Sequence, residues 1–199
     1  MPDVRGHSTH TRYALACEAA NLGGEIGVRS MSETLEGLAQ DIRTALKSAS
    51  GIEGRKKVCE RLSSALVDEA FITQHLRARA PGEHPREVLF EDPELGFCIC
   101  GHVYDGPAAG KPHDHGSAWA IYGQAAGETE MTEWKIVEKG DGDQPSLVEP
   151  VRTYTMKPGD AQLYDVGDVH SPNRAAPVKL IRIEGANLDR VTRSKIEAK

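Results

Sequence analysis

The chain changes its hydrophobic pattern near residue 80. Over residues 32–79, apolar positions recur at the three- and four-residue spacing of amphipathic helices. Ser32 can cap the first of these helices, and Pro81 and Pro85 end helical structure. The positions that carry the helical pattern are Leu35, Leu38, Ile42, Leu46, Val58, Leu62, Leu66 and Leu76.

After Pro85 the pattern becomes short runs of apolar and β-branched residues between turn signals. Seven or more short strands at such spacing favour a β-sandwich or barrel. Strands and helices do not alternate in this half, which argues against a parallel α/β sheet. The predicted strands span residues 86–91, 97–104, 117–124, 130–137, 148–156, 161–164 and 178–184.

These patterns divide the chain into three parts. Residues 1–31 show no clear pattern. We expect residues 32–80 to form a helical extension packed on a barrel, and residues 81–199 to form the barrel and a C-terminal tail. The fold class expected is therefore mainly β, with N-terminal α-helices.

Composition limits the partners. The chain has 199 residues, a net charge of −6 and 39% hydrophobic residues, so an ordinary core can form. No basic stretch favours nucleic acid, and no apolar run approaches the roughly 20 residues that span a bilayer. The N-terminus does not read as a signal peptide. The four cysteines have no C-x-x-C spacing, so we expect reduced thiols in a cytoplasmic monomer or homodimer.

Two histidines in the stretch "KPHDHGSAWAIYGQAAG" suggest a metal site. Alternate residues of a strand point to the same face, so His113 and His115 can offer two nitrogen donors to one ion while Asp114 points away. Such a pair alone is weak evidence. A third donor is available in "PGDAQLYDVGDVHSPN", where His170 follows a turn at Gly167.

Together the two stretches resemble the two motifs of the cupin superfamily. The first motif is represented by His113, His115 and Gly127, and the second by Gly159, Gly167 and His170. Asp165 stands where the second motif has proline, and Asn173 comes one residue early. The resemblance covers about residues 86–185. It implies a cupin double-stranded β-helix, a jelly-roll barrel, with a metal held by the three histidines.

The first motif lacks its usual carboxylate, because Ala120 occupies that position. A three-histidine site resembles the cysteine dioxygenase-like branch of cupins, the thiol dioxygenases. In that branch an arginine ahead of the first motif pairs with the substrate carboxylate, and Arg86 stands at the matching place. The branch also carries a Ser-x-His-x-Tyr pattern on its last strand. The matching positions here are Leu180, Arg182 and Glu184, so that hydrogen-bond relay is absent.

The last predicted strand offers further candidates. In the family's register Arg182 and Glu184 point into the barrel, where a charged pair is costly unless paired or used. Arg182 can hold an anionic group, and Glu184 can orient it or act as a base. The alternative is that both charges are solvated near an open edge. Two aromatic residues beside the first motif, Trp119 and Tyr122, can line the pocket with Leu180 or belong to the barrel core.

Three neutral imidazoles leave the full charge on a divalent ion and keep positions open for an anionic substrate and O2. Fe(II) suits oxygen chemistry, and Zn, Ni, Co or Mn also suit imidazole. The function expected is a non-haem iron dioxygenase acting on a small anionic substrate, with thiol acids among the candidates. The alternatives are a non-oxidative isomerase or lyase with Glu184 as base, and a non-catalytic small-molecule binder.

Other residues that could bind metal have simpler interpretations. Cys98, Cys100 and His102 share one face of a predicted strand, yet two thiols packing as small hydrophobes is the favoured interpretation. His7 and His10 lie in the unpatterned N-terminus and are interpreted as solvated.

Overall fold

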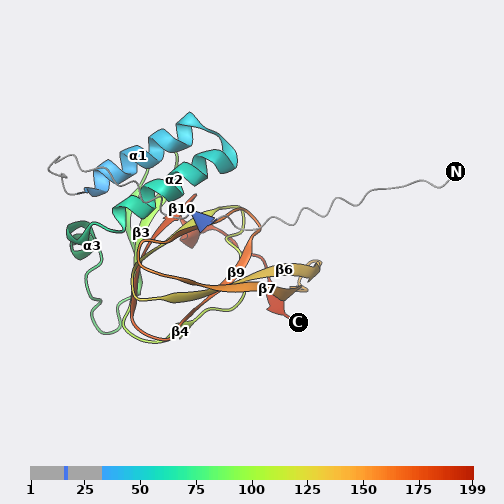
Figure 1. The fold of residues 1–199 in the computed structure, drawn as a ribbon. Helices are drawn as coiled ribbons and strands as arrows, with labels where there is room; N and C mark the ends of the chain where they lie inside the picture. The colour runs from blue at the N-terminus through green and yellow to red at the C-terminus, as the bar shows by residue number, and fades with distance from the viewer. Residues whose placement is uncertain (1–15, 18–32) are drawn as a thin grey trace.

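The barrel consists of two curled β-sheets that face each other, with helices along one side (Figure 1). The computed structural model describes residues 16–17 and 33–199. The strands are β1 (Ala16–Cys17), β2 (Arg86–Glu91), β3 (Cys98–Tyr104), β4 (Ala108–Ala109), β5 (Ala120–Ala126), β6 (Thr129–Glu138), β7 (Ser146–Met156), β8 (Ala161–Tyr164), β9 (Val169–Arg174), β10 (Val178–Glu184) and β11 (Ile196–Ala198).

The order of the strands identifies the fold. One sheet runs β1-β8-β5-β10-β3-β2 and the other β11-β7-β6-β9-β4. Without the outer strands β1, β2 and β11, each sheet has four strands, and all pairs among these eight are antiparallel. This is the arrangement of an eight-stranded jelly roll, whose connections pass repeatedly between two sheets. The expected mainly β barrel with N-terminal helices is therefore confirmed.

Three helices precede the barrel: α1 (Leu35–Ser48), α2 (Gly51–Ala65) and α3 (Glu69–His75). The Thr34 hydroxyl accepts a hydrogen bond from the Gly37 backbone at 3.0 Å, which satisfies a free N–H group at the start of α1. Asp68 caps α3 in the same way through the Phe71 backbone. The predicted cap Ser32 lies outside the described residues.

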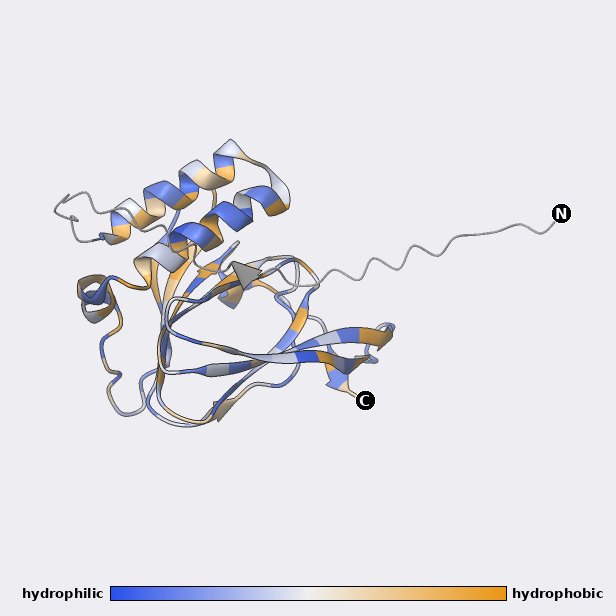
Figure 2. Cartoon of the chain, in the orientation of Figure 1, coloured by the Kyte–Doolittle hydropathy of each residue, from blue (hydrophilic) through white to orange (hydrophobic). Residues whose placement is uncertain are grey.

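The main hydrophobic core lies between the helices and the outer face of the first sheet. Leu38, Ile42 and Leu62 from the helices are fully buried against strand residues that include Ile181 and Ile183. Figure 2 shows the corresponding hydrophobic strand segments beneath α1 and α2. The period-two alternation of β10 explains this, because Ile181 and Ile183 point to the helices and Arg182 and Glu184 point to the barrel interior.

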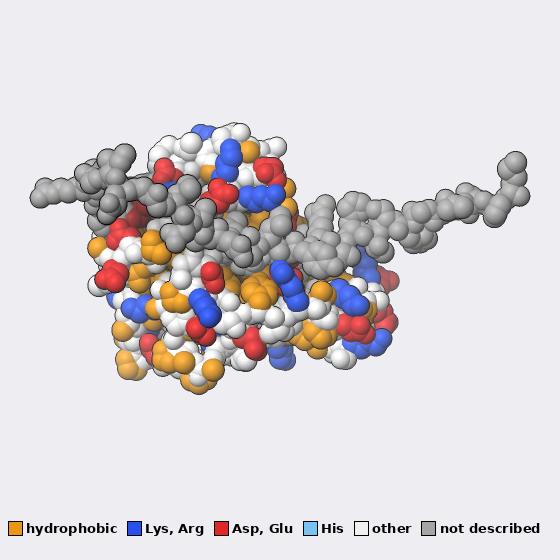
Figure 3. Space-filling view, in the orientation of Figure 1, with side chains coloured by type: hydrophobic (Ala, Val, Ile, Leu, Met, Phe, Trp, Pro, Cys, Tyr) orange, Lys and Arg blue, Asp and Glu red, His pale blue; other side chains and the backbone are white. Residues whose placement is uncertain are grey.

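Three described strands in the barrel half have no counterpart among the predicted ones: β4, β9 and β11. Each is short, and β9 contains Pro172, which weakens a strand signal. His170 lies in β9, shortly after the turn at Gly167. On the face of the barrel seen in Figure 3, acidic and basic side chains are interspersed. Within residues 33–199, none of the helices has the length and apolarity needed to cross a membrane.

We predict that Leu62 and Gly123 act as a pair in this core. A methyl group on Gly123 would lie 2.8 Å from the side chains of both Leu62 and Leu66, so Gly123→Ala should overpack the interface and cost about 1–3 kcal/mol, part of which the Leu66 contact would retain in any Leu62 variant. Leu62→Ala should cost about 2–5 kcal/mol by opening a cavity. In the double variant the added methyl should partly fill that cavity, so urea unfolding should give less than the sum of the two costs. Additive costs would contradict this packing.

Candidate metal centre

The first contact that builds the site is a backbone pairing between two of the predicted ligands. His113 and His170 lie opposite each other in an isolated antiparallel bridge, and each N–H donates to the other's carbonyl at 3.0 Å. Side chains of directly paired antiparallel residues project from the same face. His115 follows two residues after His113, so all three rings meet on one side.

The three histidines form a cluster that fits a metal ion. One ligand nitrogen from each of His113, His115 and His170 lies within 4.8 Å of the others. The ring centroids are 4.5 to 5.7 Å apart. Nδ1 of His115 and Nε2 of His170 are buried, and neither has a hydrogen-bond partner in the part of the chain that the structure describes. Convergent nitrogens with unmet bonding capacity are what a metal site requires.

Neighbouring groups fix the orientation of the rings. Nδ1 of His113 lies 2.8 Å from the Lys111 carbonyl, so this nitrogen carries the proton and Nε2 is free to bind an ion. The His170 ring stacks on Tyr164 with centroids 3.8 Å apart, and the Tyr164 hydroxyl is 2.6 Å from that of Tyr154. The ligands are therefore held before an ion arrives.

Asp114, between the two ligands of the first motif, ties their loop to the C-terminal segment. Its carboxylate accepts hydrogen bonds from the Gly116 and Ser194 backbones at 3.1 and 3.0 Å, and from the Ser194 hydroxyl at 2.5 Å. Gly116 has a φ of +60°, and a Cβ there would lie 2.2 Å from the Thr192 carbonyl. Glycine is thus required on both conformational and steric grounds.

Burial keeps the ligand histidines neutral. Desolvation lowers the pKa of His113 to about 4 and holds the pKa values of His115 and His170 well below the usual range. The nearby Arg182 guanidinium lowers all three pKa values further. Neutral imidazole is the form that binds metal.

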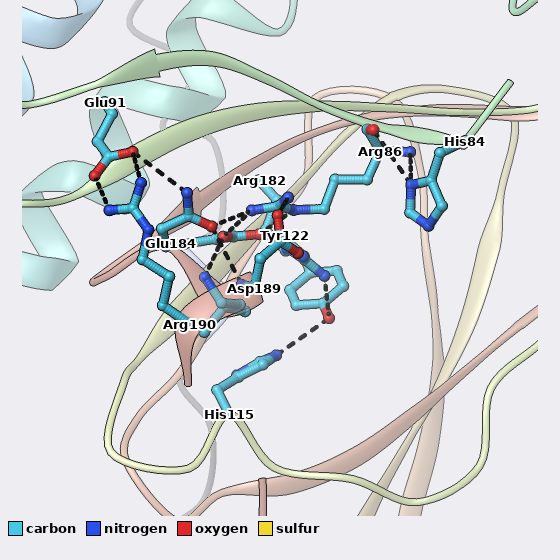
Figure 4. Close-up of polar contacts among 11 residues, drawn as sticks. His84, Arg86, Glu91, His115, Tyr122, Arg182, Glu184, Asp189 and Arg190 are labelled. Carbon is cyan, nitrogen blue, oxygen red and sulfur yellow. Dashed lines mark hydrogen bonds and ion pairs between the residues drawn. The ribbon is translucent and has the colours of Figure 1, made fainter. Parts of the chain in front are cut away.

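A pocket of about 500 Å³ lies beside the cluster, and His113 forms part of its lining. Arg86, Arg182 and Tyr122, which the sequence predicted as site residues, line it as well. Glu184 is fully buried behind the two arginines and accepts hydrogen bonds from both, at 2.8 Å from Arg182 Nε and 2.8 Å from Arg86 Nη2 (Figure 4).

This carboxylate is a weak base. Burial alone would raise the pKa of Glu184, but the hydrogen bonds and charges of Arg86 and Arg182 lower it below its usual range. Arg86 also pairs with Asp189 at 2.5 Å. Of the two alternatives for Arg182 and Glu184, the structure shows the buried pair and not the solvated one, in a network where two carboxylates compensate two guanidinium groups.

Tyr122 connects this network to the metal centre. Its hydroxyl accepts a hydrogen bond from Arg182 at 3.2 Å and lies 3.3 Å from Nε2 of His115 (Figure 4). Tyr122 lies on the neighbouring strand β5, where it is directly paired with Arg182.

The other two predicted pocket residues lie elsewhere. Trp119 packs with the core beneath the helices, with the Arg55 guanidinium 5.6 Å from its ring, and does not line the pocket. The prediction assumed a regular strand from His113, but the chain turns after His115 and β5 begins only at Ala120. Leu180 is buried on the Arg182 face of β10 without reaching the pocket lining.

The face of β3 that carries Cys98, Cys100 and His102 suggested a soft-metal site, but among the described residues it holds no metal cluster. Cys98 and Cys100 are buried free thiols, and burial raises the pKa of Cys98 to about 11, so both pack as small hydrophobes.

Sequence reasoning missed that His102 lines the pocket, and it missed Arg174 altogether. The period-two pattern alone could have placed Arg174 on the His170 face, had β9 been recognised.

We predict that the C-terminal segment supports metal affinity through Ser194. Ser194→Ala removes the hydroxyl that Asp114 accepts from, and loosening such outer contacts typically costs about 10-fold in affinity. Competition titration with a chromogenic chelator should show this loss, and Thr192→Ala on the same segment serves as the control. Equal affinities for wild type and Ser194→Ala would contradict the role.

We also predict an acid-sensitive fold in which His102 takes part. Burial, with Arg182, Arg86 and Arg174 nearby, holds the pKa of His102 well below its usual range. Below about pH 6.5 the histidine is protonated in the unfolded chain but stays neutral in the folded one. The free energy of unfolding therefore falls as pH falls. In metal-free protein, His102→Gln should make this slope shallower by up to about 1.4 kcal/mol per pH unit. Parallel slopes in urea unfolding would show that His102 is not buried and neutral.

Comparison with known proteins bears on the fold alone. No protein-family model and no curated protein sequence matches the chain. Among solved structures, a protein with a double-stranded β-helix domain from Klebsiella pneumoniae is 16% identical, with a TM-score of 0.45 over 63% of this chain and 88% of that one. A cupin superfamily protein from Desulfitobacterium hafniense is 13% identical, with a TM-score of 0.39 over 54% of this chain and 81% of that one. KdgF from Halomonas sp. is 19% identical, with a TM-score of 0.38 over 54% of this chain and 81% of that one. At these scores the jelly-roll assignment rests on the strand order, and the thiol dioxygenase branch stays a prediction.

Proposed function

We propose that the chain is a metal-dependent enzyme, a non-haem Fe(II) dioxygenase of the cysteine dioxygenase-like type that acts on a small anionic substrate. The observation that carries this proposal is the cluster of His113, His115 and His170, which contains no carboxylate among the described residues and adjoins a pocket lined by arginines. Such a donor set gives an ion no negative charge, so an anion is its natural further ligand.

The three histidines would hold the ion through their unprotonated ring nitrogens. Bound there, Fe(II) would supply a Lewis-acidic and redox-active centre with positions open to substrate and O2. The residues around it would supply binding, orientation and proton control, and these roles follow from contacts in the folded chain.

Tyr122 is positioned to control a proton next to the metal centre. Because Arg182 donates to its oxygen, the hydroxyl hydrogen is free to point toward His115 and the open side of the cluster. There it can donate a hydrogen bond to a substrate atom, and Arg182 would stabilise negative charge that develops on the oxygen.

Glu184 acts in this scheme as a positioning residue. It receives hydrogen bonds from Arg86 and Arg182 and from the Leu188 backbone at 3.1 Å, which locks both guanidinium groups in place. A carboxylate held in this way is poorly suited to abstract a proton, which disfavours an isomerase or lyase that uses Glu184 as base.

We predict distinct effects for three variants of Fe(II)-loaded protein, with O2 uptake measured against a panel of small thiols, keto acids and hydroxy acids. His170→Ala should lose the metal and all uptake. Tyr122→Phe should retain the metal yet lose about 100-fold in rate, the usual scale for removing a proton donor. Trp119→Phe, outside the pocket, should keep the wild-type rate.

Metal analysis of the purified protein decides between the classes. Tightly bound zinc with no O2 uptake across the panel would move the function to a non-oxidative enzyme. A protein that binds panel compounds without any turnover or metal would be a binding module, and the proposal would be wrong.

A further inference from the structure

The pocket is also lined by an arginine that the proposed mechanism does not use. Arg174 lies four residues after His170 on the same face of β9, and only 5% of its surface is exposed. Its guanidinium lies 4.3 Å from the centre of the Tyr104 ring, and its Nε has no hydrogen-bond partner among the described residues. Burial lowers the pKa of Arg174, which reflects an environment unfavourable to its charge.

Charge compensation sets Arg174 apart from its neighbours. Arg86 and Arg182 share Glu184, and Arg86 also contacts Asp189. Arg174 forms no ion pair with any carboxylate of residues 33–199. An arginine cannot shed its proton in a protein, so a buried unpaired guanidinium destabilises the fold unless an anion joins it. The stacked Tyr104 ring eases this cost but adds no negative charge.

His102 provides a second, independent sign of a ligand at the same place. It lines the same pocket, is 4% exposed, and its buried Nε2 has no partner in the described chain. Burial, with the charges of Arg182, Arg86 and Arg174 nearby, holds the pKa of His102 well below its usual range, so the ring is neutral. A neutral imidazole keeps one N–H, which can donate to an oxyanion oxygen that Arg174 also binds.

We propose that Arg174 and His102 form an oxyanion site for the far end of a small ligand whose other end reaches the three histidines. Four residues along β9 separate His170 from Arg174, roughly 13 Å between their Cα atoms. Arg174 lines the same cavity as His113, whose ring is one of the three donors. The substrate class is therefore a bifunctional anion, most simply a dicarboxylate or a chelating acid with a second carboxylate. This assignment refines the proposed function and relies on it only for the end at the metal.

The test is calorimetric titration of the full-length protein, metal-free and Zn(II)-loaded, with linear dicarboxylates from malonate to adipate. Arg174→Met should weaken binding about 10- to 100-fold, the scale of hydrogen bonds to a charged group. Arg174→Lys should recover part of this loss, because it keeps the charge without the fork. Arg193→Met removes the same charge from an exposed residue of the same pocket and should change affinity far less.

The thermal midpoint of Arg174→Met distinguishes a ligand-binding arginine from a purely structural one. Removing an unpaired buried charge should raise the thermal midpoint of ligand-free protein by about 2–4 °C, whereas loss of a structural contact would lower it. The best dicarboxylate should then raise the midpoint of the wild type but not of Arg174→Met. Glycerol 3-phosphate, titrated in parallel, shows whether the site prefers a carboxylate or a phosphate monoester.

Two outcomes would overturn the inference: equal losses in Arg174→Met and Arg193→Met, or a destabilised Arg174→Met with unchanged affinity. Both are distinct from failure of the proposed function. A protein without metal or O2 uptake would refute the dioxygenase, while the response of the metal-free protein to Arg174→Met and His102→Leu would still decide the oxyanion site.

Discussion

The site depends on one backbone contact, the pair of 3.0 Å hydrogen bonds between His113 and His170. These residues are far apart in sequence, and the jelly roll brings them together where a loop between β4 and β5 meets β9. The pairing puts both rings on one face, and the extended chain adds His115 two residues later. The donor geometry is therefore a property of strand register, and a slip of one residue would point His170 away from the cluster.

This dependence explains why the loop itself is tied down. Asp114 points away from the histidine cluster, because its neighbours on both sides point toward it. Its carboxylate accepts one hydrogen bond from Gly116 within the loop and two from Ser194, which join the loop to the C-terminal segment. The segment continues into β11, which pairs with β7 of the second sheet. The end of the chain thus closes over the metal loop and helps to preserve the geometry that the bridge creates.

Particular residues show how far the sequence could predict this arrangement. The three histidines were predictable, because the spacing of the first two follows from strand geometry and the third lies in a recognisable motif. Trp119 was misplaced because a turn after His115 interrupts the alternation on which its prediction depended. Arg174 was missed because its strand is short and contains Pro172, and His102 because its significance comes from arginines on other strands. Contacts between distant segments leave no local pattern in a single sequence.

The charged interior also accounts for the helices. Barrel interiors of this size are usually filled by packed side chains, but here the inward face of β10 carries Arg182 and Glu184. Their burial cannot supply the hydrophobic stabilisation that the domain needs, since buried ion pairs contribute little net free energy. The outward residues Ile181 and Ile183 supply it by packing beneath α1 and α2 with Leu62. The helices therefore place the main hydrophobic core outside the sheet, while the inside holds a smaller cluster around Met131 and Tyr164 and a pocket lined by several polar residues.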